Sequence, residues 1–134
     1  MLKPTLLNIL IFWLAKYFVL YVLLMLKNNN YVLLKINEIK NEEDLFYYLW
    51  LFLFLPIVSM ILFSTPLYFS FKVKGIFSFL LIIFGVLILE YISYTWLASQ
   101  SDFTNGFYNG IICVILILVL FYKKIPKFSK TIGN

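Results

Sequence analysis

The sequence predicts an all-α integral membrane protein, a bundle of four transmembrane helices with both termini in the cytoplasm. Hydrophobic residues make up 63% of the 134 residues and charged residues only 13%, whereas soluble domains are about 45–50% apolar and 25% charged. A soluble domain this small buries only about 60–70% of its surface. Because so much apolar surface could not be hidden from water, we expect residues 1–134 to form a single transmembrane domain.

Four apolar stretches are long enough to cross a bilayer, which takes about 17–25 residues. The expected spans are residues 5–26, 45–71, 76–98 and 105–122. Lys16 near the centre of the first span opposes insertion by about 2.5–3.5 kcal/mol. Fourteen Leu, Ile, Phe and Val residues in that span each favour insertion by up to about 0.3–0.6 kcal/mol, so insertion wins. No small-residue cleavage site follows this long stretch, so we expect a retained helix rather than a cleaved signal peptide.

Local signals mark the boundaries and the shape of the second span. Asn41 is a candidate N-cap, and the three acids at 42–44 suit the positive end of a helix dipole. Pro56 and Pro66 lie inside the span and predict a kink, because proline cannot donate a backbone hydrogen bond. Neighbouring helices can satisfy the carbonyls that are freed. Residues 72–75 form a tight connection to the third span.

The distribution of Lys predicts the orientation, since cytoplasmic loops are rich in basic residues. One side of the membrane would hold seven Lys and no acid: Lys3, Lys72, Lys74, Lys123, Lys124, Lys127 and Lys130. The other side would hold three Lys and five acids: Lys27, Lys35, Lys40, Glu38, Glu42, Glu43, Asp44 and Asp102. The seven-Lys side, with both termini, is therefore predicted to face the cytoplasm.

Two segments are expected outside the membrane. Residues 27–44 form an extracytoplasmic loop that is too apolar for a free linker, so it either lies on the membrane surface or docks a partner. Residues 123–134 form a basic cytoplasmic tail. Its Lys side chains, each worth about 1 kcal/mol near an anionic leaflet, would meet lipid head groups as a topology anchor or bind a specific lipid or partner: Lys123, Lys124, Lys127 and Lys130.

Lys16 and Glu90 are the only acid and base well inside the predicted spans. At 1.5 Å per residue they lie about 16 Å and 21 Å from the cytoplasmic ends of their helices, so they can meet if those helices are neighbours. One interpretation is a fixed intramembrane ion pair, and the other is a proton or cation site. Ser93 and Tyr94 follow Glu90 by three and four residues and extend a polar face outward.

The fourth span begins with residues suited to helix packing. Gly106 and Gly110 are four residues apart, a spacing that lets helices approach closely, and Asn105 and Asn109 can hydrogen-bond across such a contact. The contact is either internal to the bundle or made with another subunit.

The composition also argues against several classes of chemistry. The chain has no His and a single cysteine, Cys113, so we expect no disulfide, no metal site and no cofactor. Neither a phosphate-binding loop nor a nucleophile with a His partner is present, and we expect no enzyme. The net charge of +5 follows the membrane pattern above, so no nucleic acid partner is expected.

Three functions remain compatible with the sequence. The first is a small accessory or scaffold subunit of a larger inner-membrane complex, acting through helix packing with lipids and other membrane subunits as its partners. The second is a small oligomeric ion- or proton-coupled carrier that uses Glu90. The third is a membrane immunity protein against a toxin. The expected location is the bacterial inner membrane, with an organellar membrane as the alternative.

Overall fold

The computed structural model describes residues 2–29, 37, 39–98 and 102–125. Four of its helical segments are long and apolar enough to cross a membrane, which confirms the predicted all-α class and multi-pass character. In chain order the helices are α1 (Leu6–Lys27), α2 (Glu42–Leu49), η2 (Trp50–Phe54), α3 (Leu55–Ser70), α4 (Ile76–Ala98), α5 (Phe103–Phe121) and η3 (Tyr122–Lys124).

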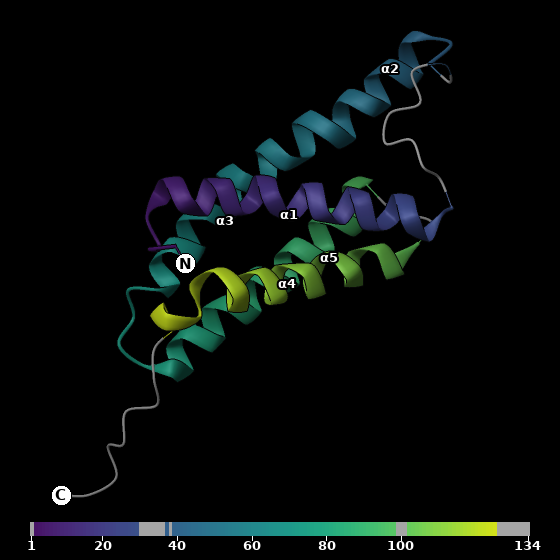
Figure 1. The fold of residues 1–134 in the computed structure, drawn as a ribbon. Coiled ribbons are helices and arrows are strands. Elements are labelled where there is room, and N and C mark those ends of the chain that lie inside the picture. Colours follow the sequence, from purple (N-terminus) through teal and green to yellow (C-terminus); the bar gives the residue numbers. More distant parts are fainter. Residues whose placement is uncertain (1, 30–36, 38, 99–101, 126–134) are drawn as a thin grey trace, which may run out of the picture.

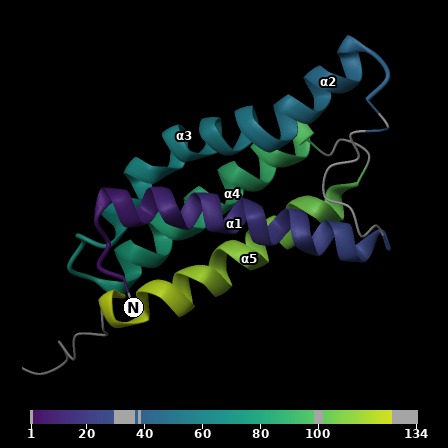
Figure 2. The ribbon, with the colours of Figure 1, turned by 45° about the horizontal axis from the view of Figure 1, so that its top comes forward.

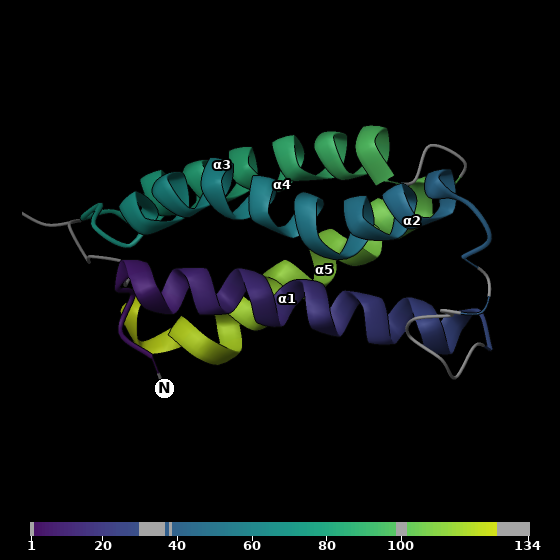
Figure 3. The same ribbon diagram turned by 90° about the horizontal axis from the view of Figure 1, so that it is seen from above.

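The four long helices form an up-down-up-down bundle of two layers (Figure 1). Seen from above, α3 and α4 form one layer and α1 and α5 the other (Figure 3). The extensive contacts are α1 with α3, α3 with α4, α4 with α5, and α5 with α1. These contacts close a ring of four helices in which neighbouring helices are antiparallel. It places α1 and α4 diagonally opposite each other across the bundle axis.

The two ends of the bundle hold different segments of the chain. The backbone N–H of Leu2 donates to the Leu120 carbonyl at 3.1 Å, so both ends of the described chain meet at one end of the bundle, called here the terminal end. The tight connection 72–75 between α3 and α4 lies there too. The distal end holds the last residue of α1, Lys27, and the N-cap of α5, Asp102.

The second span is longer than the others and is built from three joined helices. Glu42–Ser70 has 29 residues, against 22 or 23 for the other spans. Asn41 caps its start by accepting a hydrogen bond from the Asp44 N–H at 2.8 Å, as predicted. None of the residues of α2 is buried, and α2 projects from the distal end of the bundle in two views (Figures 1 and 2).

A π-helical turn precedes Pro56 in this span. The Leu55 N–H donates to the Trp50 carbonyl, five residues back, which is the hydrogen bond of a π-helix. The widened turn lies directly before Pro56, which has no backbone N–H. Two hydrogen bonds tie the turn to neighbouring helices: Tyr21 on α1 donates to the Leu51 carbonyl, and Trp50 Nε1 of the turn donates to the Leu97 carbonyl on α4 at 2.9 Å. The kink predicted at Pro56 is therefore a π-helical turn, and Tyr21 on the neighbouring α1 satisfies one of its carbonyls.

Aromatic side chains fill the terminal half of the core. Trp13 packs on Phe63 with ring centroids 5.8 Å apart, and Phe71 lies 5.1 Å from Phe121 and 5.5 Å from Phe79. These side chains come from α1, α3, α4, α5 and the residue after α3, so they tie all four long helices together. The aromatic cluster closes the core between the terminal end and the level of Lys16.

Candidate functional site

The centre of the bundle contains an ion pair between Lys16 Nζ and Glu90 Oε1. Lys16 lies on α1 and Glu90 on α4, so the pair crosses the diagonal of the bundle and lies on its axis. Their side chains are 0% and 1% exposed. The structure thus brings together the two charged residues that the sequence placed at similar depths, and it encloses both.

The Lys16 ammonium is surrounded by aromatic faces. It lies 4.7 Å from the ring centroid of Trp13 and 4.6 Å from that of Tyr17. Desolvated contacts of this kind are worth about 2 kcal/mol or more, because the ring faces carry partial negative charge. The helical spacing explains why the two rings share a face, since Trp13 and Tyr17 are four residues apart on α1. Glu90 and two aromatic rings therefore stabilise the charge of Lys16.

The Glu90 side of the pair is polar, and its hydrogen-bonding capacity is not used. Asn109 on α5 is 0% exposed, and neither its amide oxygen nor its amide nitrogen has a hydrogen-bond partner among the described residues. The same holds for the hydroxyl of Thr95 on α4, which is 5% exposed. Asn109 was predicted as a helix-packing residue at the outer end of its span. The structure buries it in the core, which agrees with the alternative of a contact internal to the bundle.

A second polar contact lies beside the pair on the α1–α3 side. The hydroxyls of Tyr17 and Ser59 are 2.5 Å apart and share a hydrogen bond, with both side chains buried. Sequence analysis did not find this contact. Ser59 carries no periodic signal in a span where polar residues are scattered, and only the packing of α1 on α3 shows its partner.

The predicted polar face of α4 divides into two parts. Tyr94 points inward and is 3% exposed, in line with Glu90 four residues before it. Ser93 lies at the edge of the core and lines a groove of about 510 Å³ between α3 and α4, together with Gly85 and Pro66. Because successive helical residues are about 100° apart, a residue next to an inward-facing position turns toward the flank.

The two glycines of α5 also have different environments. A Cβ added at Gly106 would lie 2.6 Å from Thr95 Oγ1 and 3.0 Å from the Tyr91 ring, so the absent side chain lets α5 approach α4. At Gly110, no described atom outside its own helix lies within 4 Å of that position. Gly106 is therefore at an internal helix contact, whereas Gly110 is open.

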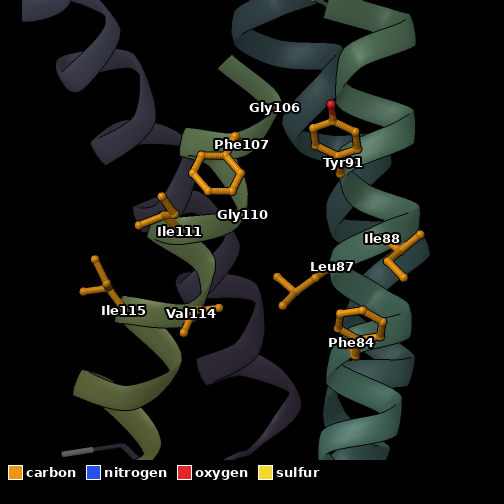
Figure 4. Close-up of a pocket in the computed structure, with 10 residues that line it drawn as sticks. All are labelled: Phe84, Leu87, Ile88, Tyr91, Gly106, Phe107, Gly110, Ile111, Val114 and Ile115. Carbon is orange, nitrogen blue, oxygen red and sulfur yellow. The ribbon is translucent and has the colours of Figure 1, made fainter. Parts of the chain in front are cut away.

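Gly110 opens onto a groove of about 410 Å³ between α4 and α5, named here the α4–α5 groove. Figure 4 shows the helix ribbons on either side, with apolar side chains on both and the two glycines on α5. Its lining residues are Phe84, Leu87, Ile88, Tyr91, Gly106, Phe107, Gly110, Ile111, Val114 and Ile115. The groove faces away from the core and runs along a helix pair of membrane-spanning length.

A cluster at the distal end joins α1 to α5. Lys27 Nζ lies 3.0 Å from Asp102 Oδ2, 3.2 Å from Thr104 Oγ1 and 3.1 Å from Asn105 Oδ1. Hydrogen bonds from Thr104 and from Lys27 lower the pKa of Asp102 from 3.8 to about 2. Asn105 thus belongs to this distal cluster. The sequence placed Lys27 and Asp102 at helix ends on one side, but not in contact.

The remaining predicted positions are on the periphery. Lys123 and Lys124 are exposed in η3 at the terminal end. Lys127 and Lys130 lie outside the described residues, as do residues 30–36 and 38 of the 27–44 loop. Among the described residues, no group of three His, Cys, Asp or Glu side chains could hold a metal ion.

Comparison with protein-family models, curated proteins and solved structures finds no match to this chain. The fold and the enclosed charges define it as a small multi-pass helical membrane protein.

Proposed function

We propose that this protein is an accessory or scaffold subunit of a larger membrane complex, and that it binds a partner's transmembrane helix in the α4–α5 groove. The observation that carries the proposal is the contrast between an enclosed ion pair and an open glycine. Lys16 and Glu90 face only the core, whereas Gly110 faces outward with room beside it. The surface, rather than the interior, is then the part available to another molecule.

The physical chemistry of membranes supports a helix as the occupant. Lipid tails are as apolar as Leu, so helices associate through close packing rather than through the hydrophobic effect. Packing is closest where a small residue lets a neighbouring side chain approach the backbone. Gly110 provides such a position midway along a groove whose other walls are aromatic and aliphatic. An apolar side chain on a partner helix would fill it.

A pull-down in mild detergent tests this proposal. Wild-type protein should recover a membrane protein in stoichiometric amount. Gly110→Leu should fold, since the added side chain meets open space, but it should lose that partner. Gly85→Leu is the matched control, because Gly85 is equally open but faces the groove between α3 and α4. Equal recovery of the partner by Gly110→Leu and wild type would contradict the assignment of the groove.

A second candidate is a small oligomeric carrier that uses Glu90. The unused polar groups of Glu90 and Asn109 at the bundle centre favour it. The aromatic cluster on the terminal side opposes it, because the buried polar side chains described there, Ser64 and Ser70, are hydroxyls, and no described charged side chain is buried toward that end. In the same pull-down, self-association without another protein would favour the carrier. Recovery of a co-encoded toxin alone would favour an immunity protein, for which the projecting α2 is the natural contact surface.

The proposed location is the bacterial inner membrane with the terminal end in the cytoplasm. The seven-Lys asymmetry supports this orientation. Topology reporters fused at Lys40 and at Lys130 test it: the first should be active only outside and the second only inside. A cytoplasmic signal at Lys40 would reverse the orientation.

A further inference from the structure

Several polar groups in the core between the levels of Glu90 and Thr95 have no hydrogen-bond partner among the described residues. Glu90 Oε2, both polar atoms of the Asn109 amide and the Thr95 hydroxyl are buried without a hydrogen bond among the described residues. A buried polar group left without a partner costs about 1–3 kcal/mol, so native structures rarely leave several together.

Helix geometry places Asn109 near Glu90, with Thr95 five residues further along α4, about 7.5 Å toward the distal end. Gly106 contacts Thr95 and Tyr91, which fixes the register of antiparallel α4 and α5. Asn109 lies three residues beyond Gly106, about 4.5 Å further along α5. That advance brings it to the depth of Glu90, which directly precedes Tyr91 on α4. Cys113, one turn further along α5, is buried in the core and 1% exposed.

On the α1 side of the ion pair the Trp13 indole N–H is also buried without a partner, whereas the groups around Glu90 supply both donors and acceptors. The Lys16 ammonium is directed at Glu90, Trp13 and Tyr17, which are an anion and two ring faces. On the opposite side, the Glu90 carboxylate and the Asn109 amide oxygen can accept hydrogen bonds. The Asn109 amide nitrogen and the Thr95 hydroxyl can donate them. A ligand here must both donate and accept hydrogen bonds, and it must be small, because α4 and α5 are in contact at Gly106.

We propose that this face is a hydration site, in which one or two water molecules bridge Glu90 to Asn109 and Thr95. Water has the required size and both hydrogen-bonding roles, and a buried water typically makes about three hydrogen bonds to groups of this kind. A metal cation is not needed, since Lys16 already supplies the positive charge at Glu90. The site goes beyond the proposed function, which does not depend on it.

Hydroxyl-radical footprinting of the full chain in lipid nanodiscs tests the site, with the radicals formed from bound water as the probe. X-ray radiolysis of bound water oxidises adjacent side chains that bulk radicals do not reach. Tyr94 and Cys113, which are 3% and 1% exposed, should be labelled in the wild type well above Phe63 and Phe79 of the aromatic cluster. Asn109→Leu should abolish the excess labelling of Tyr94, because it removes both amide hydrogen-bonding groups.

Controls separate loss of water from loss of fold. Asn105→Leu makes the same chemical change on α5 in the distal cluster, and it should leave the labelling of Tyr94 unchanged. Thr95→Val keeps the side-chain shape and should reduce the labelling, which provides a second variant if Asn109→Leu does not fold. Tyr94 and Cys113 at the level of Phe63 and Phe79 in the wild type would overturn the proposal, as would full labelling in a folded Asn109→Leu protein.

Discussion

Two Lys–carboxylate pairs in this protein have the same chemistry and opposite surroundings. Lys16 and Glu90 meet on the bundle axis with side chains 0% and 1% exposed, whereas Lys27 and Asp102 meet at the distal end with side chains 33% and 41% exposed. The central pair has aromatic rings on one side and unused amide and hydroxyl groups on the other. The distal pair belongs to a cluster that includes two more oxygen ligands of the ammonium.

The difference shows how environment decides what an ion pair contributes. Exposed ion pairs add little to the stability of the fold, because water already solvates both charges and salt screens them. A buried pair is different: its net contribution is small, but removing one partner strands the other in a medium that cannot solvate it. We therefore interpret the central pair as a constraint that fixes the register of α1 and α4, and the distal pair as a modest tie between α1 and α5.

Neutralising one member of the central pair should have the largest effect on stability. Glu90→Gln leaves Lys16 charged and without an anion at the bundle centre. We expect a loss of about 3–5 kcal/mol in the free energy of unfolding, as for other broken buried pairs. Denaturant titration in detergent micelles measures it. A loss below that of Asp102→Asn would mean that the central charges are not isolated by burial.

The two glycines of α5 show the same contrast in packing, since Gly106 contacts α4 and Gly110 is open. Gly106→Ala should lower stability by about 1–3 kcal/mol, the usual effect of overpacking, because the new methyl would meet Thr95 and Tyr91. Gly110→Ala should leave stability unchanged or raise it by up to about 1 kcal/mol, since alanine favours the helix and meets open space. Equal effects in thermal unfolding would contradict the distinction between an inward and an outward glycine.

The smallest effect should come from the distal pair, and it should depend on pH. Asp102 has a pKa lowered from 3.8 to about 2, so its charged form stabilises the fold fully above pH 3.8 and less as pH falls toward 2. Asp102→Asn should lower Tm slightly at neutral pH. The two melting curves should converge between these pH values. A Tm difference that persists at pH 2 would show that the tie does not act through the carboxylate.

Sequence patterns were sufficient for the spans, since hydropathy over about 20 residues predicts membrane helices directly. The observed α4 has the predicted bounds, and the second span begins three residues before the predicted start, where its acidic first turn was already recognised. The π-helix at Trp50 was predicted only as a kink, because Pro56 indicates where the helix is disturbed but not which hydrogen bonds replace the lost one.

The contents of the core were harder to predict than the spans. Depth along two helices indicated that Lys16 and Glu90 could meet, but their diagonal placement depends on the order of all four helices. Asn109 appears in the sequence beside two glycines, which suggested a packing face, whereas the rotation of α5 directs it to the axis and directs Gly110 outward. A weak amphipathic signal in a helix that is apolar all round does not determine that rotation.

The central claim is that Lys16 and Glu90 form a coupled structural pair in the core and that the outer surface carries the function. A double-mutant cycle with Lys16→Met and Glu90→Gln, followed by the pull-down, tests it most directly. We expect the double variant to be more stable than Glu90→Gln alone, with a coupling energy of at least about 1 kcal/mol, and to recover the same partner as the wild type. Losses of stability that simply add, or a folded double variant that no longer recovers the partner, would contradict the claim.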